Sequence, residues 1–159
     1  NATSNSAGAA INAMNLVVLA SDVINNNATA NTIADVTGLS FPVLAGETYR
    51  FEFEIFFAAA ATTTGSRWAI NGPASPTLLA YMSEYSLTTT TNTINSLTAY
   101  DTPAAANASS AATTGNIARI RGFIRPSANG TVTARFASEI LSSAITAKAG
   151  SLLKWYRTL

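Results

Sequence analysis

The sequence predicts an all-β protein, a single jelly-roll-like β-sandwich of roughly eight or nine strands. Three observations favour this fold. Apolar and polar residues alternate over short stretches, most strictly in YRFEFEIFF at residues 49–57, as in a strand with one buried face. Thr, Ser and Asn fill nearly every gap between apolar runs, and Thr favours strands. Turn signals recur between the runs, and no convincing long helix is found.

The first part of the chain is expected to form an N-terminal arm and then a series of extended segments. Small polar residues without periodicity predict a flexible arm over residues 1–15, followed by a β-sandwich domain over residues 16–159. Pro42 has no N–H to donate to a neighbouring strand, so its segment is expected at a sheet edge or at a bend. The expected segments are 16–24, 33–46, 47–57, 66–70, 78–87 and 92–100.

The second part of the chain is expected to close the sandwich. Two low-complexity stretches, residues 58–65 and 101–115, are expected to be loops. Strands over residues 116–126 and 130–140 are expected to form a hairpin, because the Asn129-Gly130 pair between them favours a tight turn. A short strand, a turn at Ala149-Gly150 and a last strand over residues 152–159 complete the fold.

The composition excludes several classes of function. Nine Lys or Arg against eight Asp or Glu give a net charge of +1, and a nucleic-acid binder needs a large positive excess to neutralise phosphates. The absence of Cys and His excludes disulfides, a Ser-His-Asp triad and the usual zinc or haem ligands. No apolar run is long enough for a membrane helix. We therefore expect no cofactor, no nucleic-acid partner and no membrane insertion.

Glu52 and Glu54 are the candidates for acid–base catalysis. They lie on one face of the strand, with Cα atoms about 7 Å apart, near the carboxyl spacing of an inverting glycosidase. Any two acidic residues at positions i and i+2 have this spacing, however, and Arg119 and Arg121 alternate in the same way on another strand. Cross-strand ion pairing accounts for both sets, so we expect no enzyme activity.

A second candidate is the densest basic cluster, which comprises Arg119, Arg121, Arg125 and Arg135. A functional interpretation is contact with an acidic partner, such as a capsid surface or a host polysaccharide. The alternative is pairing with the acidic residues Glu52, Glu54 and Glu139, which the near-zero net charge favours. Arg suits both roles, because its planar fork binds carboxylates bidentately.

Aromatic residues provide the remaining candidates. Trp68, next to Arg67 and before an Asn-Gly-Pro turn, and Tyr81 are candidates for stacking on sugars, although such rings are more often core or interface residues. The last strand carries apolar residues on both faces, so one face is expected in the core and the other against a neighbouring subunit. The predicted oligomer-interface residues are Leu152, Trp155, Tyr156 and Leu159.

Four stretches resemble the surface domains of tailed-bacteriophage virions. They are GLSFPVLAGETYRFEFEIFF, TTTGSRWAINGP, SANGTVTARFASE and the ending SAITAKAGSLLKWYRTL. The resemblance is to the compact sandwiches, often likened to the tumour-necrosis-factor jelly roll, of head decoration proteins and fibre tips. It implies a homotrimer with a structural or attachment role on the virion surface, assembled in the bacterial host cytoplasm. The major capsid protein would be a partner. It implies no catalytic residue.

Two functions therefore remain as hypotheses beside a hydrolase that would use Glu52 and Glu54. The first is a trimeric capsid decoration or fibre domain that stabilises the particle or presents an attachment surface. The second is a carbohydrate-binding adhesin of a tail fibre, with host surface glycan as its ligand.

Overall fold

The computed structural model describes residues 12–158, and within that range it contains eleven β-strands and no helix. The predicted all-β sandwich is confirmed, with eleven strands instead of eight or nine. The strands are β1 (Asn15–Val18), β2 (Val23–Asn25), β3 (Ala34–Val43), β4 (Tyr49–Ala59), β5 (Ser66–Asn71), β6 (Leu78–Ser86), β7 (Asn92–Leu97), β8 (Asn116–Arg125), β9 (Gly130–Ser138), β10 (Ile145–Ala147) and β11 (Leu152–Arg157).

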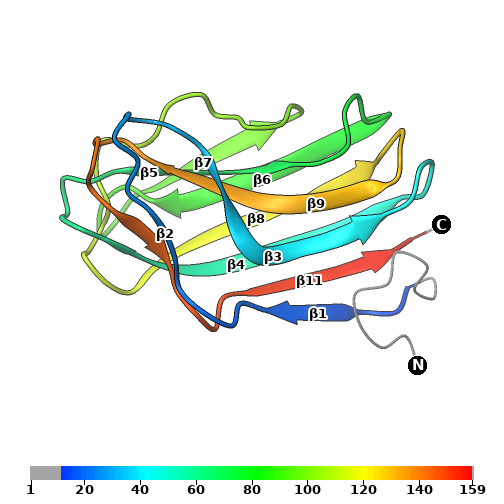
Figure 1. Cartoon of the computed structure of the whole chain (residues 1–159), viewed down its shortest axis with the longest axis horizontal. Helices are drawn as coiled ribbons and strands as arrows, with labels where there is room; N and C mark the ends of the chain where they lie inside the picture. Colours follow the sequence, from blue (N-terminus) through cyan, green and yellow to red (C-terminus); the bar gives the residue numbers. More distant parts are fainter. Residues whose placement is uncertain (1–11, 159) are drawn as a thin grey trace.

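The strands form two antiparallel sheets that lie one over the other as the layers of a sandwich (Figure 1). The large sheet has the order β1-β11-β4-β8-β6-β7, with β10 paired to β4 and β2 paired to β10. The small sheet has the order β3-β9-β5. Strands far apart in the chain pair in nested fashion, β1 with β11, β3 with β9 and β4 with β8, which is the connectivity of a jelly roll.

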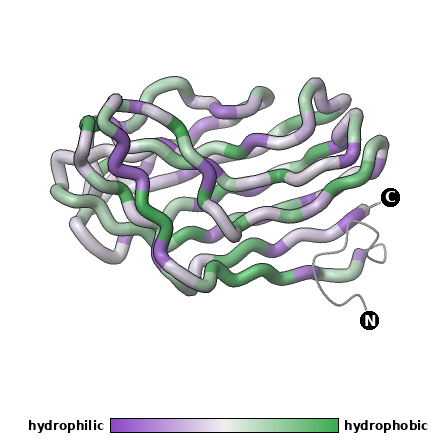
Figure 2. Tube along the Cα trace, in the orientation of Figure 1, coloured by the Kyte–Doolittle hydropathy of each residue, from purple (hydrophilic) through white to green (hydrophobic). Residues whose placement is uncertain are grey.

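The core lies between the sheets and is dominated by the inward face of β4. That face is at most 1% exposed at each position and consists of Tyr49, Phe51, Phe53, Ile55 and Phe57. Each such side chain contributes about 1.5–3 kcal/mol on burial. The alternation that predicted this strand appears as the change of colour along the strands of the large sheet (Figure 2).

Two aromatic contacts join the sheets through this core, Phe41 with Trp155 and Trp68 with Phe57. Phe41 of β3 stacks on Trp155 of β11 with ring centroids 5.3 Å apart. At the other end Trp68 of β5 stacks on Phe136 of β9 at 5.2 Å and lies 5.0 Å from Phe57 of β4. Such pairs add roughly 0.5–1.5 kcal/mol beyond the area that they bury.

The first expected strand, residues 16–24, is two strands in the structure. β1 pairs with β11, whereas β2 pairs with β10, so the chain bends between them opposite the turn that separates β10 from β11. Backbone hydrogen bonds hold the two bends together, from Leu19 N to Ser151 O (2.7 Å) and from Gly150 N to Leu19 O (2.9 Å). Periodicity alone does not reveal such a bend, because both strands keep their apolar residues.

The expected hairpin at Asn129-Gly130 is wrong. β8 belongs to the large sheet and β9 to the small one, so residues 126–129 cross between the layers. The Asn129 side chain accepts a hydrogen bond from Ala45 N (2.9 Å), and Pro126 O accepts one from Gly46 N (2.8 Å). These bonds tie the crossing to the β3–β4 turn instead of closing a hairpin.

Pro42 is placed as its chemistry predicts. β3 pairs with β9 alone and forms one edge of the small sheet, where the missing N–H costs no ladder bond. Of the expected N-terminal arm, residues 1–11 lie outside the described residues, as does Leu159 of the last strand.

Candidate functional site

The outer face of the large sheet is an open surface whose side chains come from six neighbouring strands. The register places outward residues in rows across the sheet. One row runs Leu16, Lys154, Glu52, Arg121, Met82, Ser96. The next runs Val18, Leu152, Glu54, Arg119, Glu84, Ile94. We call these two the central rows.

Charges occupy the middle of the central rows. Arg119 Nη2 lies 3.3 Å from Glu54 Oε1 across β4 and β8, which confirms the predicted cross-strand pairing at this position. Glu52 lies opposite Arg121 in the same register. Among residues 12–158, however, Glu52, Arg121 and Lys154 form no ion pair of 4.0 Å or less. The face therefore carries acidic and basic groups side by side, part of them without a partner in the described chain.

Large apolar side chains surround these charges. Their exposed fractions range from 37% to 58% and they are Leu16, Val18, Phe56, Met82, Ile94, Ile117 and Phe123. The guanidinium of Arg50 lies 5.4 Å from the ring centroid of Phe123, a cation–π contact that keeps this ring at the surface. Large apolar groups gathered on one exposed face indicate a contact surface, and this face differs from an ordinary interface in carrying its charges at the centre instead of at the rim.

Three shallow hollows open on or beside this face. One of about 440 Å³ lies over β6, β7 and β8 and is lined by Arg50, Met82, Arg121 and Phe123, among others. A second of about 380 Å³ lies at the end of β6 and β8 and is lined mainly by polar groups, including Glu84, Asn92 and Arg119. A third of about 450 Å³ lies over β4 and β11 beside Glu52 and Lys154. All three are open, so none of them excludes water from Glu52 and Glu54.

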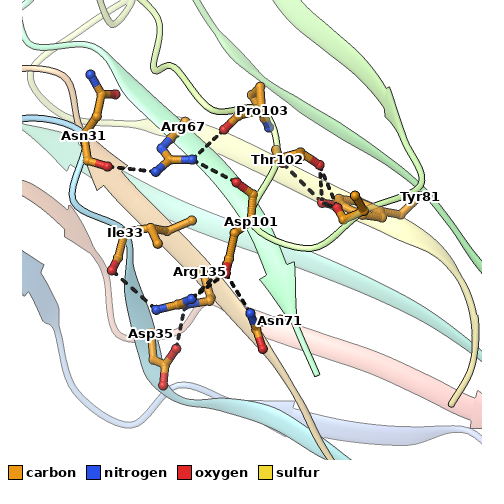
Figure 3. A network of polar contacts seen from close by, with 11 residues as sticks. Asn31, Ile33, Asp35, Arg67, Asn71, Tyr81, Asp101, Thr102, Pro103 and Arg135 are labelled. Atoms are coloured by element: carbon orange, nitrogen blue, oxygen red, sulfur yellow. Dashed lines mark hydrogen bonds and ion pairs between the residues drawn. The ribbon is translucent and has the colours of Figure 1, made fainter. Parts of the chain in front are cut away.

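Arg67 does not face a ligand site, which corrects the expectation from its sequence position. It is 6% exposed, and its guanidinium donates to three backbone carbonyls: Asp101 O (2.9 Å), Pro103 O (2.6 Å) and Asn31 O (2.8 Å). Figure 3 shows that Arg67 joins the β2–β3 connection and the β7–β8 connection to β5 of the small sheet. Burial lowers the pKa of Arg67, while the neighbouring Asp101 opposes that shift.

Arg135 belongs to the same network and not to the basic cluster in which the sequence places it. Its Nη1 donates to both carboxylate oxygens of Asp101 (2.9 and 2.8 Å), and its Nε lies 2.8 Å from Asp35 (Figure 3). The other three arginines of the cluster are outward on β8. There Arg125 donates to Thr48 Oγ1 at 2.9 Å, at the end of the strand. Glu139 is not among the ion-pair partners of these arginines in the described residues.

Trp68 and Tyr81 are also buried, which corrects their assignment as sugar-stacking residues. Trp68 is 0% exposed and its indole N–H donates to Ser66 Oγ (2.9 Å). Tyr81 is 3% exposed and its hydroxyl donates to Ala99 O (2.9 Å). Neither ring offers a face to a ligand in this fold.

The predicted interface residues of the last strand divide between the two faces of β11. Trp155 is 0% exposed and belongs to the core, so its assignment to an interface is corrected. Leu152 and Tyr156 are half-buried on the outer face, next to β4. Sequence reasoning missed most of this face, including Met82, Ile94 and Phe123. The available signal was that outward positions of several strands are apolar.

Burial changes the ionisation of two tyrosines beneath these surfaces. Desolvation raises the pKa of Tyr85 to about 12. The same cause raises the pKa of Tyr100 to about 12, and its neutral hydroxyl donates to Pro73 O (2.9 Å). Both hydroxyls are therefore neutral under ordinary conditions, and that of Tyr85 accepts a hydrogen bond from Asn95 Nδ2 (3.3 Å).

In the described residues, no group of three or more acidic side chains converges in a way that could hold a metal ion. Over the same range no helix has the length and apolar character needed to cross a membrane.

Comparison with known proteins adds little to this description. No family model and no curated protein matches the chain. Among solved structures, the VP2 subviral particle of infectious bursal disease virus is similar with a TM-score of 0.29 and 8% identity, over 92% of this chain and 42% of that chain. The Gx strain of the virus gives 0.27 and 8%, over 91% and 40%. The chain spans about two fifths of the length of these structures, and TM-scores this low do not establish a shared topology.

Proposed function

We propose that this chain is a non-enzymatic structural protein of a virion surface, a homotrimeric capsid decoration or fibre domain of a tailed bacteriophage. The observation that carries the proposal is the outer face of the large sheet, which is broad, open and built from apolar and charged groups in alternation. Such a face suits shape-complementary binding to other proteins. The stretches that resemble phage surface domains supply the virion setting and the trimer.

The particle itself provides the test. Antibodies raised against the chain are used to follow it in density gradients of nuclease-treated particles from the source culture. The chain is expected to band with nuclease-resistant particles and to remain there after a salt wash. Its absence from the particle fractions, with the free chain present at the top of the gradient, would contradict the proposal.

A carbohydrate-binding adhesin remains the second candidate, because the hollow of about 440 Å³ carries an exposed ring beside two arginines. Phe123 is 40% exposed there, and Phe56, elsewhere on the same face, is 41% exposed. A glycan array with Phe123→Ala and the matched control Phe56→Ala separates the candidates. A structural protein shows no specific glycan. Specific binding lost in Phe123→Ala and retained in Phe56→Ala would favour the adhesin.

The non-enzymatic part of the proposal has its own test. Glu54 is paired to Arg119 on an open face, and the hollows that the described residues form around it are open to solvent. Reducing-end release from bacterial surface polysaccharides is therefore expected at background level. Release by the wild type that disappears in Glu52→Gln or Glu54→Gln would show a hydrolase instead.

A further inference from the structure

We propose that the outer face of the large sheet is a two-fold contact surface that binds a second copy of this chain, with β4 of one copy opposite β8 of the other. The inference rests on the proposed structural function and goes beyond its homotrimer, because a two-fold contact joins two single chains or two trimers. It rests on the register of the sheet and on the order of charges along the central rows.

The strand order supplies the symmetry. The large sheet reads β1-β11-β4-β8-β6-β7, so the midline of the six strands lies between β4 and β8. Two faces can meet through a two-fold axis only if the axis lies in the plane of contact. An axis parallel to the strands and above this midline places β4 over β8, β11 over β6 and β1 over β7 of the partner. Each row of one copy then lies opposite the same row of the second copy.

The charges match under this operation. Glu52 and Arg121 share one row, and Glu54 and Arg119 share the next. Each carboxylate on β4 of one copy therefore meets a guanidinium on β8 of the other, and the reverse pair forms by symmetry. Arg121 and Glu52, which have no ion-pair partner among residues 12–158, gain one each.

The alternative in-plane axis is rejected by the same charges. An axis perpendicular to the strands places β4 over β4 and β8 over β8. Carboxylates then face carboxylates and guanidinium groups face guanidinium groups, and such like-charge contacts disfavour the arrangement. The charge pattern thus selects one of the two directions.

The apolar residues fit the selected axis as well. Val18 on β1 lies in the row of Ile94 on β7, so these two exposed side chains, 54% and 58% accessible, meet at each rim. Lys154 lies opposite Met82 of the second copy, and its aliphatic stem packs over the methionine side chain. Its ammonium group is then within diagonal reach of the partner's Glu84.

The size of the face suits a contact at the small end of the specific range. Six strands about 4.8 Å apart span about 24 Å, and four outward positions about 7 Å apart along β4 span roughly 20 Å. The resulting flat area is on the order of 500 Å² before side-chain relief is counted, against roughly 600–800 Å² per partner in stable interfaces.

Complementary charge reversal provides the test. Glu52→Lys with Glu54→Lys makes the centre of the face basic on both strands, and Arg119→Glu with Arg121→Glu makes it acidic on both. Each double variant is expected to weaken self-association by at least about 100-fold and to sediment as a 16.5 kDa monomer. An equimolar mixture is expected to restore a 1:1 pair, because every β4–β8 contact then joins unlike charges.

Controls separate folding from association. The four substituted side chains are outward and partly exposed, so circular dichroism is expected to show folded protein for both variants. Asp22→Lys, a charge reversal at an exposed turn outside the face, is expected to leave self-association unchanged.

Two outcomes overturn the inference. One is wild-type mass in either double variant. The other is a mixture in which both variants are folded but stay monomeric. A ring of three copies would give this result, because two variants cannot alternate around an odd number of positions. The particle gradient does not use this contact, so its result reports separately on the virion role.

Discussion

At the scale of single residues, Arg67 has a structural role that its position in the sequence does not reveal. It is buried on the outer side of β5 because the connection after β7 covers that strand, and its three hydrogen bonds end on backbone carbonyls. Every residue has a backbone carbonyl, so the sequence does not show which carbonyls accept hydrogen bonds from an arginine. The pattern SRWAINGP therefore predicts a strand with an arginine on one face, but not the three hydrogen bonds of Arg67.

Arg67→Met is expected to destabilise the fold by about 3 kcal/mol or more. The substitution keeps the length of the side chain but leaves three partly buried carbonyls without this donor, and hydrogen bonds from a charged group are worth about 1.5–3 kcal/mol each. Urea unfolding followed by tryptophan fluorescence measures the loss. Arg119→Met, which removes an exposed pair, should cost less than about 1 kcal/mol. Equal losses in the two variants would contradict the assigned role.

The buried tyrosines predict a loss of stability in alkali. Burial raises the pKa of Tyr85 and of Tyr100 from 10.0 to about 12. A pKa raised on folding stabilises the protein fully below the unfolded value, and that stability is lost as the pH rises through the folded value. The free energy of unfolding is therefore expected to fall between about pH 10 and pH 12.

Tyrosinate absorbance and near-ultraviolet circular dichroism, recorded together, check this expectation. The last tyrosines should ionise together with the loss of tertiary signal, and Tyr85→Phe should flatten the alkaline slope. Ionisation of every tyrosine near pH 10 with an intact tertiary signal would show that these hydroxyls are not buried.

Among the strands, β4 was the most predictable and the β8–β9 connection the least. Strict alternation places the residues of β4 correctly on both of its faces, because one period-2 pattern fixes a strand's orientation. The Asn-Gly pair after β8 has the chemistry of a hairpin turn, yet the chain crosses to the other sheet there. The crossing depends on Ala45 and Gly46, which lie more than eighty positions earlier in the sequence, and local turn rules do not include them.

Gly122 of β8 is the one position of the large sheet where a missing side chain is structurally required. A Cβ at this residue would lie 2.3 Å from Ala80 O and 2.5 Å from Tyr81 Cβ, because Tyr81 is its direct partner on β6. The tyrosine thus occupies the space beside the glycine, as aromatic residues do in cross-strand pairs with glycine.

Gly122→Ala is expected to destabilise the protein by about 1–3 kcal/mol, since the contact is with backbone atoms that cannot move aside cheaply. Gly46→Ala is the comparison. A Cβ added at Gly46 would have no atom within 4 Å. The substitution would then cost only the backbone strain of a non-glycine residue at a φ of +79°, about 1 kcal/mol. Thermal unfolding compares the two. A smaller loss for Gly122→Ala than for Gly46→Ala would show that β6 and β8 are not this close.

For the molecule as a whole, composition and alternation were sufficient to predict the sandwich, since an all-β chain of this length must bury two patterned sheet faces against each other. They were not sufficient to predict what the outer face does. Trp68, Tyr81 and Trp155, which the sequence offers as candidates for a ligand site or an interface, fill the core. The contact residues come from six strands whose order only the fold reveals.

The most direct measurement is the native mass of the wild-type chain by light scattering across a range of concentrations. The two-fold contact predicts an even number of copies of 16.5 kDa, either a pair or, if the homotrimer also forms, six. A mass that remains at one copy up to high concentration, or that settles at three, would contradict the pairing of the outer faces of the large sheet.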